Sequence, residues 1–265
     1  MKISARSWFI ALALTVAFPL AAAASPLQLI QNGSFASGDL TGWTVTDANN
    51  GCGACGSWSV VAGTTATAAL SNKPLPGTDP SGANYYALAD EYLPASNALT
   101  QSFTVPDGAT RLDLSFNMFI NNWGAVTNCG DTLTTLVPND PNQCVFVSIL
   151  AGAAKALTES FVAPGVVDSI VQGAPFANSE TGSHGWVGYN YELTNLTPGD
   201  TYQLQFAQAN DQGNLNVGVT DVSLTAVTVT PEPVPLLLLA TGLLGLALVG
   251  RKFWPARTGE DRSLP

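Results

Sequence analysis

Basic residues are scarce in this chain of 265 residues, which has nine Lys and Arg against 19 Asp and Glu. Between residues 25 and 230 only Lys73, Arg111 and Lys155 are basic and 16 residues are acidic, so this part has a net charge of 3 − 16 = −13. Binding to DNA, RNA or anionic lipid through phosphate contacts requires Lys and Arg, so the shortage argues against these ligands. The acidic excess favours solubility and is compatible with divalent cations.

Catalytic motifs are equally sparse. His184 is the one histidine, no Gly-x-Ser-x-Gly elbow surrounds a serine, and there is no phosphate-binding loop or dinucleotide fingerprint. Asp90 and Glu91 are adjacent, so on a strand they would point to opposite faces, whereas a glycosidase needs two carboxylates across one sugar ring. We therefore expect no catalytic residues and no enzyme activity. A triad built on His184, whose partners need not be close in sequence, stays open as an alternative.

The N-terminal 24 residues have the three-part pattern of a secretory signal peptide. Lys2 and Arg6 are basic, residues 8–20 are mainly apolar, and four alanines at 21–24 supply small side chains for signal peptidase. We expect cleavage at the end of this segment and export through the inner membrane.

The C-terminal 36 residues, 230–265, hold three features in a fixed order. Pro231-Glu232-Pro233 comes first, an uncharged apolar run over 234–250 follows, and Arg251 and Lys252 precede a polar tail at 253–265. At about 1.5 Å per residue, a helix over the apolar run would be roughly 25 Å long, the short end of what a bilayer core needs. The two basic residues would face the cytoplasm.

These three features resemble the PEP-CTERM sorting signal of exopolysaccharide-producing Gram-negative bacteria. The resemblance implies that an exosortase, a membrane-embedded cysteine transpeptidase, recognises the segment and removes the tail. It also implies a transient anchor in the inner membrane, followed by transfer to the cell envelope or extracellular matrix. A plain single-pass anchor with a proline-rich stalk is the alternative.

Four cysteines, Cys52, Cys55, Cys129 and Cys144, lie in the region that would be exported. In an oxidising compartment an even number indicates disulfides, and sequence proximity favours Cys52–Cys55 and Cys129–Cys144 among three possible connectivities. The first pair also has redox-motif spacing, but no helix pattern follows it to lower a thiol pKa. A zinc site would need a second close pair. We therefore predict structural disulfides.

Short runs of alternating polar and apolar residues, separated by Gly, Pro and Asn, predict an all-β fold of the sandwich or jelly-roll type. No repeat of a solenoid or propeller is present. The clearest runs are 42–46, 112–116, 145–149, 202–206 and 222–227.

Segments near both ends of the exported region sharpen this prediction. Three groups of segments carry the signal. The first group is Asn32-Gly33-Ser34-Phe35 with 38–43, the second is 83–88 with 99–106, and the last is 205–211 with 219–224. They resemble the opening strands and the closing strand pair of galactose-binding-like jelly rolls, which include several families of carbohydrate-binding modules.

That resemblance implies a structural Ca²⁺ where the first and last strands meet. Asn32 and Asp221 match the family's positions, whereas Ala36 stands where the family is frequently acidic. Calcium takes six to eight oxygen ligands, so these two residues would be part of a larger set. The alternative is that Asn32 begins a turn and Asp221 is a solvated residue at a strand edge.

Exposed aromatic rings flanked by Asn, Asp and Gln are the usual platform for sugars. Trp123, Trp186 and Tyr189 are our candidates for carbohydrate binding, although large aromatic side chains more often pack in a core. We predict a signal peptide at 1–24, a jelly-roll sandwich at 25–229 and a sorting signal at 230–265. We expect the whole chain to be a non-enzymatic envelope or matrix protein that binds carbohydrate such as exopolysaccharide and requires no cofactor. A secreted glycan hydrolase and a purely structural protein are the alternatives.

Overall fold

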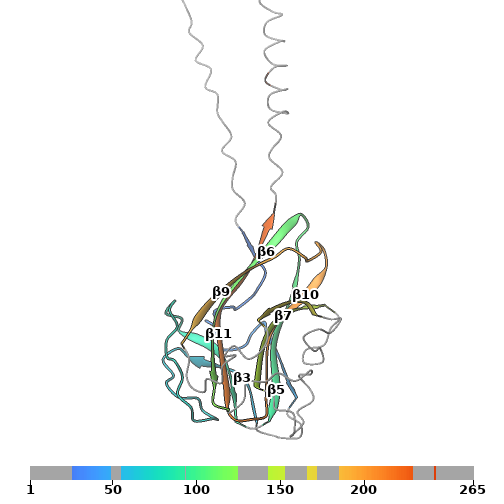
Figure 1. Cartoon of the computed structure of the whole chain (residues 1–265). Helices are drawn as coiled ribbons and strands as arrows, with labels where there is room; N and C mark the ends of the chain where they lie inside the picture. Colours follow the sequence, from blue (N-terminus) through green and yellow to red (C-terminus); the bar gives the residue numbers. More distant parts are fainter. Residues whose placement is uncertain are drawn as a thin grey trace, which may run out of the picture. The chain divides into compact units, whose positions relative to one another are not determined.

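Segments in which polar and apolar residues alternate form the strands of two antiparallel sheets, and these sheets pack face to face (Figure 1). The computed structural model describes residues 26–48, 55–92, 94–124, 143–152, 166–171, 185–228 and 242. The described sandwich falls within one compact unit, Ser25–Val229.

Sheet A holds six strands in the order β3-β4-β11-β6-β9, and β1 also pairs with β11. Every pairing in it is antiparallel. Its strands are β1 (Leu27–Gln28), β3 (Gly56–Ala62), β4 (Tyr85–Glu91), β6 (Ala109–Asn122), β9 (Val187–Leu193) and β11 (Leu215–Thr228).

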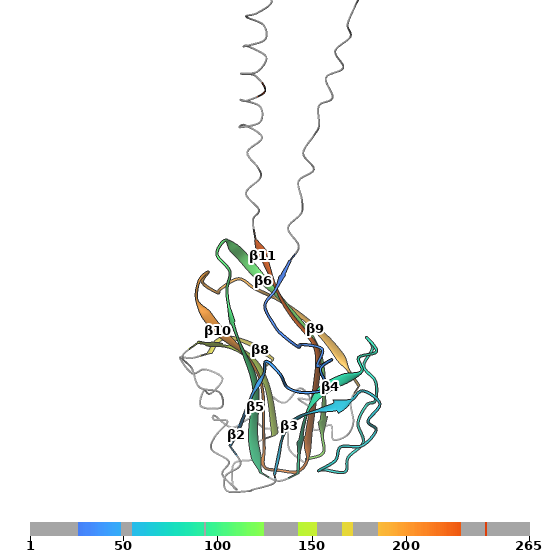
Figure 2. The ribbon, with the colours of Figure 1, turned by 180° about the vertical axis from the view of Figure 1, so that it is seen from behind.

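Sheet B holds five strands in the order β2-β5-β10-β7-β8, again with antiparallel pairs. Figure 2 shows the sandwich from behind, where β5 and β10 of sheet B are separate from β4 and β9 of sheet A. The strands are β2 (Thr44–Ala48), β5 (Ala95–Thr104), β7 (Gln143–Ala151), β8 (Val166–Val171) and β10 (Thr201–Asn210).

The core lies between the sheets and is built from alternate residues of each strand, as period-two alternation requires. In β6, Leu112, Leu114 and Phe116 point inward and are at most 2% exposed, while Asp113 and Ser115 point to the outer face. Burial of apolar side chains between the sheets is the main source of stability, at roughly 25 cal/mol per Å².

One part of the outer face of sheet A is covered by the segment between β3 and β4, residues 63–84. Ala68 and Leu75 of this segment form a second apolar cluster with Tyr86, Leu88 and Phe119. The outer-face residues Asp113 and Ser115 lie outside this cluster.

β11 is interrupted by a bulge at Asp221 and Val222, where its register with β6 shifts between Thr220 and Ser223. Asp221 has a left-handed φ of 52°. Gly33 lies against the bulge: its carbonyl accepts from Val222 N at 3.0 Å, and a Cβ on Gly33 would be 1.9 Å from Val222 O. Bulges redirect side chains, and this one aims Asp221 toward the outer face of sheet A.

The all-β prediction is confirmed: the five alternating runs fall in or at the edges of strands β2, β6, β7, β10 and β11. The expected closing strand pair is different, because β10 belongs to sheet B and β11 to sheet A, so they do not pair with each other.

The predicted end segments, with the signal peptide, Pro231-Glu232-Pro233, Arg251 and Lys252, lie outside the described residues. Of the predicted helix at 234–250 only Gly242 is described. Within the described part of the chain, no helix has the length and apolar character needed to span a membrane.

Candidate functional site

Trp123 follows the end of β6, and both its ring and its nitrogen have protein partners. Its Nε1 donates to Asn216 Oδ1 at 3.2 Å. Lys73 Nζ lies 5.2 Å from the ring centroid, which is cation–π distance. Lys73 therefore lies over the ring of Trp123, at the position that a bound sugar would need.

Trp186 precedes β9 and packs on the outer face of sheet A. Its ring meets Tyr86 edge-on at 5.2 Å and Phe119 at 4.7 Å, and its Nε1 donates to Gly77 O at 3.0 Å. These contacts anchor the segment over 63–84 to the start of β9.

Tyr189 points into the sandwich. Its ring stacks on Phe116, with centroids 5.0 Å apart, and on Tyr191 at 6.4 Å. Burial, and to a lesser degree the neighbouring Tyr191, raise the pKa of Tyr189. Tyr189 faces the core while Trp186 lies on the outer face, so the candidate rings do not form a single platform. Their role in carbohydrate binding stays a prediction.

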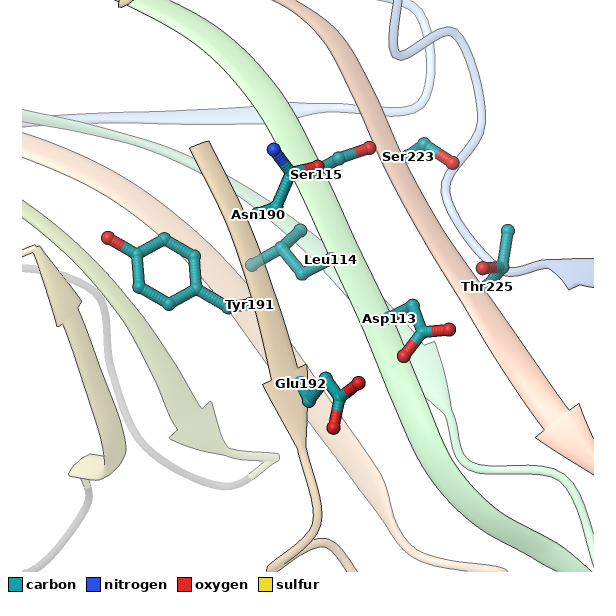
Figure 3. A pocket seen from close by; sticks show the side chains of 8 residues that line it. All are labelled: Asp113, Leu114, Ser115, Asn190, Tyr191, Glu192, Ser223 and Thr225. Carbon is teal, nitrogen blue, oxygen red and sulfur yellow. The ribbon is translucent and has the colours of Figure 1, made fainter. Parts of the chain in front are cut away.

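The structure instead shows a polar groove on the outer face of sheet A, across β9, β6 and β11 (Figure 3). It has a volume of about 460 Å³. Leu114 and Tyr191 also line the groove, but their side chains point toward the core: Leu114 is part of it, and Tyr191 packs against it. Its polar lining residues are Asp113 and Ser115 from β6, Asn190 and Glu192 from β9, and Ser223 and Thr225 from β11.

Strand register brings these polar side chains together. Asp113 pairs with Glu192 and Ser115 with Asn190 across β6 and β9. On the other side, Asp113 pairs with Thr225 and Ser115 with Ser223 across β6 and β11. Direct cross-strand neighbours have Cβ atoms about 4.5–5.5 Å apart, so the two rows form a continuous hydrogen-bonding surface.

Arg111 joins the two carboxylates of the groove. Its Nε lies 3.0 Å from Asp113 Oδ1, and its NH1 lies 3.3 Å from Glu192 Oε1. All three side chains are well exposed, at 41%, 39% and 63%, so the ion pairs contribute little to stability. With two carboxylates and one guanidinium, the groove keeps a negative charge.

Gln28 supports the groove from β1. Its Nε2 donates to Ser223 Oγ at 2.8 Å, and its Oε1 accepts from Leu224 N at 2.9 Å. Gln28 thereby fixes the Ser223 hydroxyl at one end of the polar row.

The two predicted calcium ligands have different partners. Asn32 Nδ2 donates to Asp39 O at 3.0 Å and Thr41 O at 3.1 Å, so Asn32 closes a turn. Asp221 Oδ2 accepts from Asn117 Nδ2 at 3.2 Å and from the Ser81 hydroxyl. The Asn32 amide nitrogen faces carbonyls, which does not fit a calcium site shared with Asp221.

Asp79 is the second carboxylate beside Asp221. The Ser81 hydroxyl lies 3.0 Å from Asp79 Oδ2 and also contacts Asp221, while Ser81 N donates to Asp79 Oδ1. Among the residues that the structure describes, no three His, Cys, Asp or Glu side chains group as metal ligands. The calcium prediction therefore has no further support and stays a prediction.

Asp90 and Glu91 point to opposite faces of β4, as alternation predicts. The Asp90 carboxylate accepts from Leu70 N, Ser71 N and Asn216 Nδ2 and so holds the covering segment on sheet A. Glu91 is inward and fully buried. The two carboxylates thus do not share a cleft.

Neither Cys55 nor Cys144 is a free thiol. Cys52, Cys129 and His184 lie outside the described residues, so the predicted disulfide pairing stays a prediction.

Sequence reasoning did not find the groove. The relevant signal was present, because Arg111, Asp113 and Ser115 alternate with leucines, and Asn190 and Glu192 alternate with tyrosines. The pairing of β6 with β9, which makes these residues neighbours, is not visible in either run alone.

No protein-family model matches the sequence, and no curated protein matches it. Solved structures to which this chain is similar include TmCBM61 in complex with β-1,4-galactotriose, at 13% identity and a TM-score of 0.40 over 76% of this chain and 99% of that one. The K1 cleaved adhesin domain of Lys-gingipain from Porphyromonas gingivalis W83 has 13% identity and a TM-score of 0.44 over 78% and 100%.

The enzymatically active domain of tailspike protein 4 from bacteriophage CBA120 has 12% identity and a TM-score of 0.44 over 76% of this chain. This chain spans 21% of that tailspike chain. At these identities and TM-scores, the similarities assign neither a family nor an activity to this chain.

Proposed function

We propose that this chain is an exported, non-enzymatic protein whose sandwich domain binds carbohydrate in the groove on the outer face of sheet A. The observation that carries this proposal is the groove itself, in which six polar side chains from three strands face solvent together. Sugar hydroxyls both donate and accept hydrogen bonds, and this lining offers carboxylate, amide and hydroxyl partners.

The carboxylates dominate the recognition. Asp113 and Glu192 accept hydrogen bonds from sugar hydroxyls, and such bonds to charged groups are worth about 1.5–3 kcal/mol each. Arg111 pairs with both carboxylates and so links them across β6 and β9. The polar lining contains no aromatic side chain that points outward, so binding rests on hydrogen bonds.

Charge selects the class of glycan. The groove has two carboxylates and one guanidinium, and the whole chain has a net charge of −10. Uronic acids bring further negative charge and are repelled, whereas neutral sugars and amino sugars are accepted.

The placement of the two carboxylates favours binding over hydrolysis. A glycosidase needs two carboxylates that flank the scissile bond on either side of a sugar ring. Asp113 and Glu192 are instead direct register partners on one outer face, and Arg111 pairs with both. We therefore propose a binding role without catalysis.

The proposed location of the protein depends on the sequence patterns at the two ends of the chain. The signal peptide pattern at 1–24 and the Pro231-Glu232-Pro233 signal support export, processing by an exosortase-type enzyme and delivery to the cell envelope or matrix. Mass spectrometry of the mature protein tests this: a product that ends near Pro231–Pro233 supports sorting, and an intact Pro265 contradicts it.

Binding is tested with the full-length chain on arrays of neutral, amino and uronic acid oligosaccharides, followed by calorimetric titration of the best ligand. The double variant Asp113→Asn/Glu192→Gln should lose about tenfold or more in affinity. Asp107→Asn, an exposed turn residue outside the groove, is the matched control and should bind like the wild type. Equal affinity of the double variant, or a preference for uronic acids, contradicts the proposal.

A further inference from the structure

Gln28 belongs to β1, at the margin of the groove. It is the register partner of Thr225 in β11, so both side chains lie on the outer face of sheet A. Gln28 does not line the groove itself, whereas Thr225 and Ser223 do. It acts on the groove through the hydrogen bonds of its side-chain amide.

Three backbone N–H groups fix the orientation of the Gln28 amide. Its Oε1 accepts from the backbone nitrogens of Leu29, Ile30 and Leu224 at 3.0, 3.1 and 2.9 Å. If the amide were turned over, its NH2 group would face three N–H groups, and donors do not pair with donors. The amide oxygen is therefore held at this position, and the amide nitrogen is held toward Ser223.

The Ser223 hydroxyl is oriented in turn. Gln28 Nε2 donates to Ser223 Oγ at 2.8 Å. The NH2 group of Gln28 has no lone pair to offer, so the hydroxyl hydrogen of Ser223 points away from it. In the described part of the chain, no acceptor is paired with this hydrogen. Ser223 therefore presents a donor to the groove that it lines.

A carboxylate lies across from this donor. Asp113 of β6 is the register partner of Thr225 and so lies diagonally across from Ser223 (Figure 3). Diagonal neighbours in a sheet are about 7–8 Å apart, a distance that a hydroxyl group with a hydrogen bond on each side spans. The ionised Asp113 carboxylate, paired with Arg111, only accepts hydrogen bonds. The groove thus presents a donor at Ser223 and an acceptor at Asp113.

We propose, resting on the carbohydrate-binding role of the groove, that Gln28 is a positioning residue that selects a neutral sugar hydroxyl between Ser223 and Asp113. This hydroxyl accepts from Ser223 and donates to Asp113, which continues a chain of hydrogen bonds that begins at Gln28. Hydrogen bonds in such a chain strengthen one another. An ammonium group has no lone pair for Ser223 and a carboxylate has no hydrogen for Asp113, so neither replaces the hydroxyl here.

Gln28→Glu reverses this polarity with almost no change in side-chain size. The new carboxylate still accepts from the three backbone N–H groups, but it also accepts from the Ser223 hydroxyl, which then turns its hydrogen away from the groove. The probes are β-1,4-linked trisaccharides of glucose, galactose and mannose, titrated calorimetrically into the full-length chain. For the trisaccharide that the wild type binds best, Gln28→Glu should weaken binding about tenfold, and Ser223→Ala should do so as well.

The double variant Gln28→Glu/Ser223→Ala separates polarity from charge. In the Ser223→Ala background no hydroxyl is left to reverse, so Gln28→Glu should change the affinity by less than about twofold. Gln31→Glu, which adds the same charge at an exposed residue outside the groove, is the matched control and should bind like the wild type. The Tm of Gln28→Glu should stay within about 3 °C of the wild-type value, since the backbone hydrogen bonds to this side chain persist.

Two results overturn this inference and leave the proposed function standing. One is binding that Asp113→Asn/Glu192→Gln weakens but that Gln28→Glu and Ser223→Ala leave unchanged. The other is an equal loss from Gln28→Glu with and without the Ser223 hydroxyl, which would show that the added charge acts alone. If the wild type binds none of the trisaccharides, or if Asp113→Asn/Glu192→Gln binds them as tightly as the wild type, the carbohydrate-binding role of the groove fails together with the role of Gln28.

Discussion

Tyr189 lies almost flat on Phe116, with ring centroids 5.0 Å apart and ring planes 14° apart. This stacking turns the tyrosine toward the core and leaves Asn190 and Glu192, its neighbours in β9, on the outer face with the groove. One strand thus contributes aromatic side chains to packing and polar side chains to the groove.

Replacement of Tyr189 should therefore affect stability more than binding. Tyr189→Ala removes a half-buried ring and should lower the free energy of unfolding by about 1–3 kcal/mol. Tyr189→Phe keeps the stack and should cost much less. Urea denaturation measures both variants; a loss of glycan affinity in Tyr189→Ala with unchanged stability would show that the ring binds sugar directly.

Gly218 of β11 is required by close packing. It is the register partner of Phe119, and a Cβ at this position would lie 2.0 Å from Phe119 Cε1. Gly218→Ala should therefore destabilise the fold by about 1–3 kcal/mol through overpacking. Gly185→Ala is the matched control, since an added Cβ there meets no atom within 4 Å. Equal midpoints in chemical denaturation would refute this account.

Replacement of Arg111 should change ligand affinity in the groove and have little effect on the stability of the fold. Because its ion pairs with Asp113 and Glu192 are exposed, Arg111→Ala should change the free energy of unfolding by less than about 1 kcal/mol. The loss of its positive charge should lower any residual affinity for acidic oligosaccharides further and increase that for amino sugars. Calorimetric titration at low and high salt checks this, because screening should reduce the difference.

Glu91 should make stability depend on pH. Its folded-state pKa is raised well above the usual 4.5, so the folded protein holds a proton that the unfolded chain releases. This contribution to stability is fully present below about 4.5 and is lost as pH rises toward the folded-state pKa. Glu91→Gln should be less sensitive to pH than the wild type across that window, as measured by denaturation at a series of pH values. Parallel pH profiles would contradict the assignment.

The pattern of alternation was enough to predict the all-β class and the opposite orientations of Asp90 and Glu91. It could not decide which face of β9 is buried, because a one-residue change in orientation moves Tyr189 and Tyr191 from core to surface. The sequence therefore suggested Tyr189 as a sugar platform, and the structure places it against Phe116.

Contacts between distant segments were the part that sequence patterns could not supply. Asp113 and Glu192 become neighbours only through the pairing of β6 with β9, and Glu91 meets Gln208 only through the packing of sheet A on sheet B. Asn32 and Asp221 show the same limit: both lie near the bulge of β11, but hydrogen bonds direct their side chains to different partners.

The segment over 63–84 covers the part of sheet A beside the groove, held by Asp90 and by the apolar cluster around Phe119. Under the proposed binding role, the length of this segment would limit how many sugar units the exposed face can accommodate. A shorter connection between β3 and β4 would uncover the outer face toward Asn117, so the proposed ligand could be lengthened by engineering this connection without altering the strands.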